Sequence, residues 1–125
     1  MKKILVVDDN TTIIMLIKTK LVANGYDVIS AYNGESGWQA ISHEKPDLVL
    51  LDIMMPRMDG FQVFEKLLSE PSTNGIPVIF LTASGQREDE KRAMEMGAKH
   101  FLTKPFSPNN LLEIVNGILG TGESV

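Results

Sequence analysis

Five short, mostly apolar runs recur along this 125-residue chain, and amphipathic stretches separate them. Short continuous apolar runs are typical of strands buried on both faces, as in a parallel sheet covered by helices. Their regular alternation with helical stretches predicts an α/β fold built from successive β-α units. The expected strands are Ile4–Val7, Val28–Tyr32, Leu48–Leu51, Val78–Leu81 and His100–Thr103.

Five helices are expected, one after each strand. In four of them the apolar residues recur about one helical turn apart, which gives each helix an apolar stripe that faces the core. The stripes are Ile13, Ile17 and Leu21; Trp38 and Ile41, in a helix over about 34–44; Phe61, Phe64 and Leu68; and Leu111, Val115 and Ile118. The remaining helix, Gln86–Met96, is highly charged, so we expect it to face solvent and to be held loosely.

Glycine, serine and proline mark the expected helix ends. Gly25 and Gly97 are placed to end the first and fourth helices in a left-handed conformation. Ser107 and Pro108 are suited to the cap and first turn of the last helix. Gly37 lies inside the second helix, where glycine costs about 1 kcal/mol relative to alanine, so this helix is the least strongly predicted.

Length and composition predict one domain with a hydrophobic core, because 43% of the residues are hydrophobic. The apolar run near the amino terminus is shorter than the roughly 7 to 15 residues of a secretion signal, and no run approaches the ~20 residues of a membrane span. The chain has no cysteine, in agreement with a reducing compartment, and we expect it in the cytoplasm. A net charge of -4 gives no electrostatic footprint for nucleic acid.

Polar residues follow four of the expected strands. Asp8 and Asp9 follow the first strand, and Asp52 follows the third. Thr82 and Lys104 follow the fourth and the fifth. Because ligands bind at the carboxyl ends of the strands in open α/β sheets, these side chains should meet in one pocket. Each residue alone could be a helix cap or a turn former, and it is their combination that predicts a site.

The chemistry of such a pocket follows from its charges. Three carboxylates about 4 Å apart would repel by roughly 4 kcal/mol per pair at an effective dielectric constant near 20. Lys104 offsets part of this, and the remaining acids suit Mg²⁺, which binds carboxylates together with water and a phosphoryl oxygen. The ion would keep Asp52 ionised and nucleophilic, while Lys104 and Thr82 donate to phosphoryl oxygens. The sequence therefore predicts phosphorylation of Asp52.

The same residues lie in segments that resemble the receiver domain of two-component response regulators. The segments are Val6–Asp9, Leu51–Gly60, Leu81–Ala83, Gly97–Ala98 and Lys104–Phe106. The resemblance covers about residues 2–119 and leaves 120–125 as a polar tail or the start of a linker. It implies a flavodoxin-like (βα)₅ fold, a doubly wound parallel sheet with strand order 2-1-3-4-5.

The resemblance also implies how the pocket is used. Asp52 would be the phosphoacceptor, Asp9 would bind Mg²⁺ directly, and Asp8 would act through a water. Met54 would contribute its backbone carbonyl to the ion.

The remaining residues would act on the phosphoryl group or respond to it. Lys104 would pair with the phosphoryl oxygens, Thr82 would bond one of them, and Phe101 would be the switch aromatic. The Lys104–Pro105 peptide bond would be cis.

The partners implied are a sensor histidine kinase or phosphotransfer protein, and a downstream effector or fused output domain. The fourth helix, fifth strand and fifth helix would form the face that changes, and phosphorylation could also drive homodimerisation. Such a domain is a signalling module and not an enzyme, since it catalyses only its own phosphotransfer and dephosphorylation. No membrane and no direct nucleic-acid contact is expected.

Three alternative functions compete with this interpretation. An aspartate-based phosphohydrolase is disfavoured because similar enzymes carry a second aspartate two residues after the nucleophile, where this chain has Met54. A flavin-binding module of the same fold is disfavoured because Asp8 and Asp9 would repel the flavin phosphate. A receiver-like scaffold that is never phosphorylated stays open, although the complete set of site residues argues against it.

Overall fold

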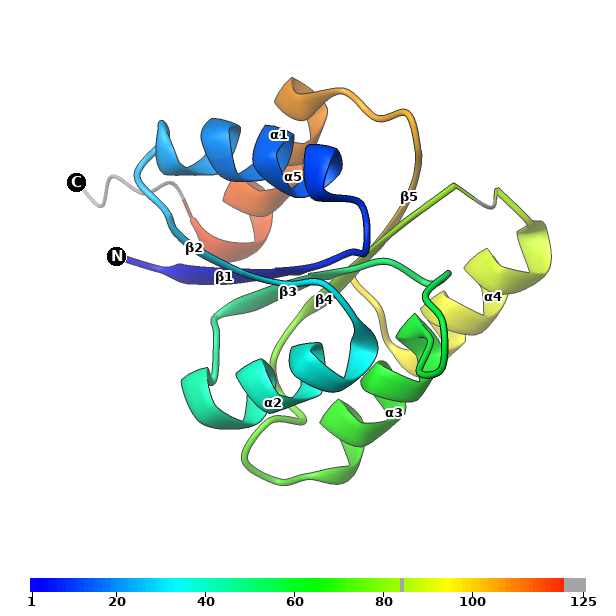
Figure 1. Ribbon diagram of the computed structural model, residues 1–125. Coiled ribbons are helices and arrows are strands. Elements are labelled where there is room, and N and C mark those ends of the chain that lie inside the picture. The colour runs from blue at the N-terminus through cyan, green and yellow to red at the C-terminus, as the bar shows by residue number, and fades with distance from the viewer. Residues whose placement is uncertain (84, 121–125) are drawn as a thin grey trace.

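Strands and helices alternate along the chain in the computed structural model, which describes residues 1–83 and 85–120 (Figure 1). The strands are β1 (Lys3–Val7), β2 (Asp27–Ala31), β3 (Leu48–Leu51), β4 (Val78–Thr82) and β5 (His100–Thr103). The helices are α1 (Thr11–Val22), α2 (Gly34–Glu44), α3 (Gly60–Ser69), α4 (Arg87–Met96) and α5 (Pro108–Leu119). The predicted alternation is confirmed, with β2 ending one residue before the expected Tyr32.

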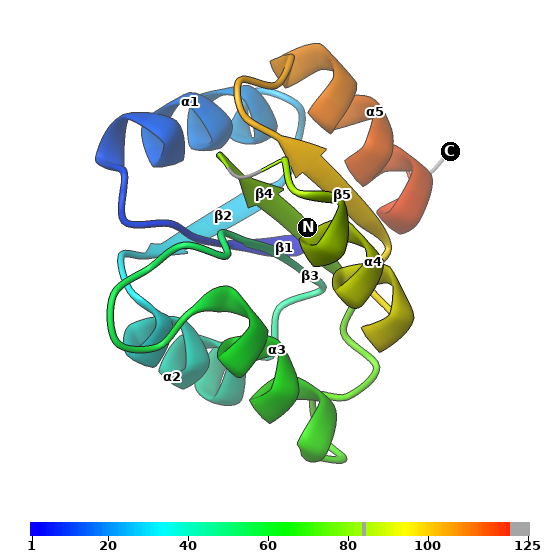
Figure 2. The same ribbon diagram turned by 90° about the vertical axis from the view of Figure 1, so that its right-hand side faces the viewer.

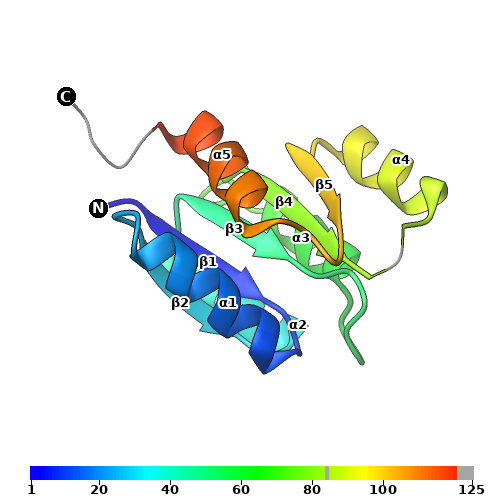
Figure 3. The ribbon, with the colours of Figure 1, turned by 90° about the horizontal axis from the view of Figure 1, so that it is seen from above.

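The strands form one parallel sheet in the order β2-β1-β3-β4-β5. Helices α1 and α5 cover one face, and α2, α3 and α4 lie on the other (Figures 1 and 3). The predicted flavodoxin-like class and strand order are therefore confirmed. Within the described residues, no helix is both long and apolar enough to cross a membrane.

Two hydrophobic cores lie on the two faces of the sheet, and β1 supplies side chains to both. Ile4 and Val6 pack with α1 and α5, whereas Leu5 and Val7 pack with α2 and α3. Burying one such side chain stabilises the fold by roughly 1.5–3 kcal/mol. Since alternate residues of a strand point to opposite faces, a strand covered on both sides must be apolar throughout, which explains the unbroken runs.

Gly37 lies at a close contact between α2 and β1. A Cβ atom at this position would lie 2.8 Å from Cγ1 of Val7, closer than real carbon atoms approach. The glycine therefore lets α2 lie directly on the sheet, where Ile41 is fully buried and Trp38 packs against the same core. This packing offsets the low helix propensity that made α2 the weakest prediction.

The buried stripes of two helices differ by one residue from the prediction. Ile14, and not Ile13, is buried in α1 with Ile17 and Leu21. Leu67 is fully buried in α3, whereas Leu68 is 36% exposed. The helices themselves are as predicted, but neighbouring apolar residues give the same helical spacing, and only the angle of the helix on the sheet selects between them.

The helix ends are largely as predicted. Gly97 ends α4 at φ = 104°, and the Ser107 hydroxyl accepts the Asn110 N–H at 3.2 Å at the start of α5. Gly25 does have a left-handed φ of 92°, but it is not the cap, because α1 ends at Val22 and is followed by a right-handed Ala23.

Both ends of the described chain lie beside the start of β2. The Asp27 N–H donates to the carbonyl of Lys2 at 2.9 Å, just before β1. The hydroxyl of the buried Tyr26 contacts the Asn116 amide oxygen and lies 3.0 Å from the Gly120 carbonyl, just after α5. These contacts bring residues 2 and 120 to the edge of the sheet where the strands begin (Figure 1).

Candidate functional site

The carboxyl ends of the strands bring the predicted site residues together at the opposite edge. Asp8 follows β1, and Asp52 follows β3 with its N–H donating to the Val7 carbonyl at 2.9 Å. Thr82 is the last residue of β4, and Lys104 follows β5 with its N–H donating to the Thr82 carbonyl at 2.8 Å. Backbone pairing between neighbouring strands thus places four residues that are far apart in the sequence.

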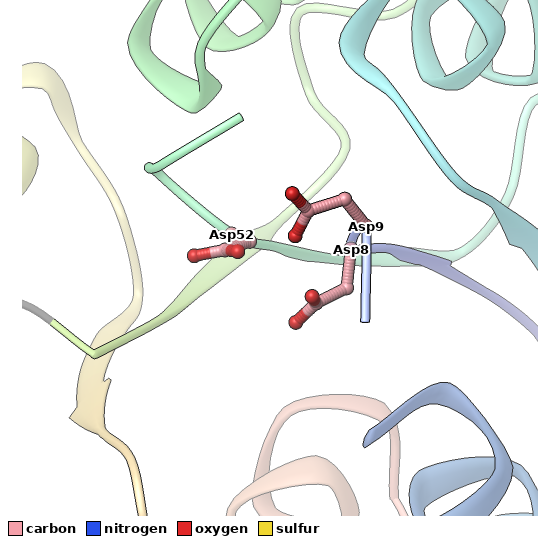
Figure 4. A group of neighbouring side chains, drawn as sticks. All are labelled: Asp8, Asp9 and Asp52. Atoms are coloured by element: carbon pink, nitrogen blue, oxygen red, sulfur yellow. The ribbon is translucent and has the colours of Figure 1, made fainter. Parts of the chain in front are cut away.

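Three carboxylates gather in this pocket. Asp8, Asp9 and Asp52 each place an oxygen within 4.8 Å of the others (Figure 4). Asp8 and Asp52 are buried, and Asp9 is exposed. At this separation two full charges repel by about 3 kcal/mol at an effective dielectric constant near 20. The arrangement therefore requires compensating positive charge.

Lys104 supplies one such charge. Its Nζ lies 2.7 Å from Oδ2 of Asp8 and 3.5 Å from Oδ2 of Asp52. With all groups ionised, three carboxylates and one ammonium group leave a formal charge of two minus in the pocket. A set of oxygen ligands with this residual charge fits a hard divalent cation such as Mg²⁺.

The pKa of Asp52 is raised from 3.8 to about 6. Burial of the carboxyl group is the main cause, and the negative charge of Asp8 acts in the same direction. The charge of Lys104, the Met54 N–H and a hydrogen bond from Lys104 oppose the rise. A perturbed carboxyl group among close charge partners in a pocket is a candidate reactive group.

The loop between β3 and α3 holds the backbone close to Asp52. A Cβ atom on Gly60 would lie 2.3 Å from the Asp52 carbonyl oxygen, so only glycine fits there. Asp59 and Gln62 form a capping box at the start of α3, with bonds of 3.0 and 2.9 Å. Met54, in the same loop, donates its N–H to Oδ1 of Asp52 at 3.3 Å, and its side chain is 60% exposed.

Thr82 and Phe101 lie on one face of the sheet. Phe101 pairs with Phe80 across β4 and β5, and Thr82 is two residues further along the same strand as Phe80. Thr82 is fully buried, whereas the Phe101 side chain is half-buried with its ring centre 6.5 Å from that of Phe80. The Lys104–Pro105 bond is cis, as predicted.

Asn10 is a site residue that the sequence did not single out. Its N–H donates to Oδ1 of Asp8 at 2.9 Å, and its side chain caps α1 by accepting from Thr12 and Ile13. Asn10 thus fixes both the Asp8 carboxylate and the start of the helix. An asparagine directly ahead of a helical stretch is a recognisable cap signal, so the sequence did contain this information.

Comparison with known proteins agrees with this geometry. The family described as "Response regulator receiver domain" matches residues 4–116. The alkaline phosphatase synthesis transcriptional regulatory protein PhoP of Bacillus subtilis is 41% identical over 98% of this chain and 50% of its own length. Protein PilH of Pseudomonas aeruginosa is 39% identical over 95% of this chain and 98% of its own length. The chain spans about half the length of several curated relatives that it matches.

Solved structures show the same architecture. Chemotaxis protein CheY4 of Vibrio cholerae superposes with a TM-score of 0.88 at 28% identity, covering 95% of this chain and 99% of that one. The receiver domain of the Francisella response regulator 1452 superposes with a TM-score of 0.86 at 34% identity, covering 94% of this chain and 96% of that one.

Proposed function

Because this chain belongs to the response regulator receiver domain family, a family of two-component signalling domains, we propose that Asp52 is its phosphoacceptor. One observation supports this most strongly. Asp52 is buried at a strand end, 3.5 Å from the Lys104 ammonium group, with oxygens of two further acids within 4.8 Å. The domain then acts in signalling, and its own phosphorylation and dephosphorylation are the only reactions it assists.

The reaction we propose is a phosphoryl transfer to one carboxylate oxygen of Asp52. The new O–P bond forms as the bond from phosphorus to the donor breaks, and the donor's imidazole nitrogen or acyl oxygen keeps that electron pair. Lys104 is placed to exchange its contact with Asp52 for one with a phosphoryl oxygen. The Thr82 hydroxyl, at the end of the adjacent strand, would donate to another.

Asp8, Asp9, Asp52 and the Met54 carbonyl would hold Mg²⁺, with Asp8 acting through a water. When bound, the ion supplies neutralising charge for both the carboxylates and the phosphoryl oxygens. The support from the structure is the donor set, in which hard oxygen ligands carry more negative charge than Lys104 balances.

The partners follow from the same proposal. A sensor histidine kinase or phosphotransfer protein would donate the phosphoryl group to the domain, residues 2–119. The face made by α4, β5 and α5 would then bind an effector, contact a fused output domain or form a homodimer. Residues 121–125, expected to belong to a tail or linker, lie outside the described part of the chain.

The test is phosphorylation with Mg²⁺ and acetyl phosphate, followed by mass spectrometry. The wild-type protein should gain one phosphoryl group, and Asp52→Asn should gain none. Asp9→Ala should require more Mg²⁺, because the remaining ligands meet the ion's octahedral geometry poorly. Phosphate retained in Asp52→Asn would show that another residue is the acceptor, and a wild-type protein that is never modified would favour the scaffold alternative.

A further inference from the structure

Helix α4 has fewer buried residues than any other described helix. Ala93 is its one buried residue, and Gln86 makes no side-chain cap hydrogen bond at its start. Figure 1 shows α4 at one edge of the molecule, and Figure 2, seen from that side, shows it in front of β5 with α3 next to it. A helix with so few apolar contacts needs another means of attachment to keep one position.

Arg92 provides such an attachment while its side chain stays 56% exposed, in agreement with the predicted solvated face of this helix. Its guanidinium carbon lies 4.1 Å from the centre of the Phe61 ring. Its Nη2 lies 3.7 Å from Oε1 of Glu65, one turn further along α3. A planar guanidinium group can stack flat on a ring while its N–H groups face a carboxylate, which suits it to this double contact better than a lysine ammonium group.

The ring under Arg92 is linked to Phe101 through one intervening ring, that of Phe80. Phe61 lies 5.3 Å from Phe80, and Phe80 lies 6.5 Å from Phe101, measured between ring centres. Arg92 also lines an open groove with Met54 and other residues of the loop that follows Asp52. The contact therefore joins the aromatic residues to a groove that the loop after Asp52 also lines.

We infer that Arg92 is a positioning residue that holds α4 against α3 in the unphosphorylated domain, and that this contact weakens when the domain is activated. The second part rests on the proposed function. Phe80 lies between Phe101 and Phe61, so a Phe101 ring that turns inward and shifts Phe80 would also change the tilt of Phe61 under the guanidinium group. Loss of this contact would free the helix that has the fewest other attachments.

Hydrogen exchange of the unphosphorylated protein tests the first part. Arg92→Ala should raise amide exchange in residues 87–96 about two- to tenfold, the range for one exposed stacking and ion-pair contact. Alanine has the highest helix propensity, so faster exchange would reflect lost docking and not a weaker helix. Arg92→Lys should give an intermediate increase.

Lys91→Ala is the matched control, because among the described residues Lys91 forms no ion pair or ring contact. It should leave the exchange of α4 unchanged. Equal exchange in Arg92→Ala and the wild type, or an equal increase in Lys91→Ala, would overturn the positioning role.

Addition of Mg²⁺ and beryllofluoride, an analogue of the phosphoryl group, tests the second part. Exchange of α4 should rise in the wild type and rise less in Arg92→Ala, in which the contact is already absent. An equal rise in both proteins would overturn the coupling. If beryllofluoride does not perturb the amide resonance of Asp52 in the wild type, the proposed function has failed, while the unphosphorylated comparison still decides the role of Arg92.

Discussion

At the scale of single residues, the burial of the Asp52 carboxyl group has a cost in stability. Its pKa is 3.8 as a free group and about 6 in the fold, so the folded protein favours the protonated form. Between these values the folded state holds more protons than the unfolded state, and the free energy of unfolding falls as the pH rises. Ionised Asp52 therefore destabilises the metal-free domain at neutral pH, by about 3 kcal/mol.

Replacing Asp52 with Asn should remove this penalty, because the amide carries no charge. In the presence of a chelator, we expect the stability of Asp52→Asn relative to wild type to increase by up to about 3 kcal/mol from pH 4 to pH 7. Urea unfolding at both pH values measures the difference. Asp27→Asn, which removes an exposed carboxylate on β2 outside the pocket, is the control. A constant difference for Asp52→Asn would contradict the raised pKa.

We expect Met54 to affect how long a phosphoryl group persists on Asp52. Hydrolysis requires a water aligned behind phosphorus, and the thioether of Met54 is a poor group for orienting one. We expect Met54→Asn to speed loss of the phosphoryl group, because the amide can hold that water, and Met54→Leu to leave the rate unchanged. The decay of the phosphorylated protein, followed by mass spectrometry, measures this. Decay in Met54→Asn as slow as in Met54→Leu would count against it. Ser84, two residues after Thr82 in the sequence, is a second position without a carboxylate or amide to orient this water, and it lies outside the described residues.

At the scale of the elements, sequence pattern predicted the existence and order of all the described strands and helices. The pattern sufficed because a strand buried on both faces must be apolar throughout, and because helix stripes repeat. The pattern did not show whether Leu67 or Leu68, or whether Ile13 or Ile14, is the buried residue, because either residue of each pair fits the helical repeat of apolar positions. It also could not give the reason for Gly37, whose close contact is with Val7 on another element.

The strand β4 should transmit phosphorylation through Thr82. We expect Thr82→Ala to accept the phosphoryl group but not to pass the change on to residues 85–119, because no hydroxyl is drawn toward the phosphoryl oxygen. Amide NMR with Mg²⁺ and beryllofluoride measures the shifts, and Thr82→Ser is the control that keeps the hydroxyl. If the shifts in Thr82→Ala match those of the wild type, a switch that pairs Thr82 with Phe101 is not the route.

At the scale of the whole molecule, the parallel topology is what made the site predictable. Residues at the carboxyl ends of β1, β3, β4 and β5 converge in any sheet of this order, whatever lies between them in the sequence. No comparable rule of topology predicts the contact of Arg92 with Phe61. It depends on the angle between two helices, and no spacing in the sequence encodes that angle.

The outer face of α1 adds a surface beside the pocket. Met15 is 70% exposed, Leu16 45% and Val22 50%, although a surface helix normally turns polar residues outward. The helix begins at Thr11, directly beyond the acids of the pocket, so a protein donor that reaches Asp52 would cover this face.

We therefore expect Met15→Glu to slow phosphoryl transfer from a phosphorylated protein donor at least about tenfold, the effect of losing roughly 1.4 kcal/mol of binding. Transfer from acetyl phosphate should not change, because this small donor does not have to bind the outer face of α1. Leu68→Glu places the same charge at an exposed leucine of α3 and should affect neither reaction. Equal rates for Met15→Glu and wild type with the protein donor would exclude this face.

The hydrogen bonds that join Lys2 and Gly120 to residues 26 and 27 have a consequence for how the domain can be joined to others. Both points of attachment lie at one edge of the sheet, and Asp52 lies at the other, about 17 Å away for a five-residue strand. A neighbouring domain can be added, exchanged or removed at either terminus without any change next to Asp52. Recombination at the ends of the coding sequence would thus be enough to give one pocket many different outputs.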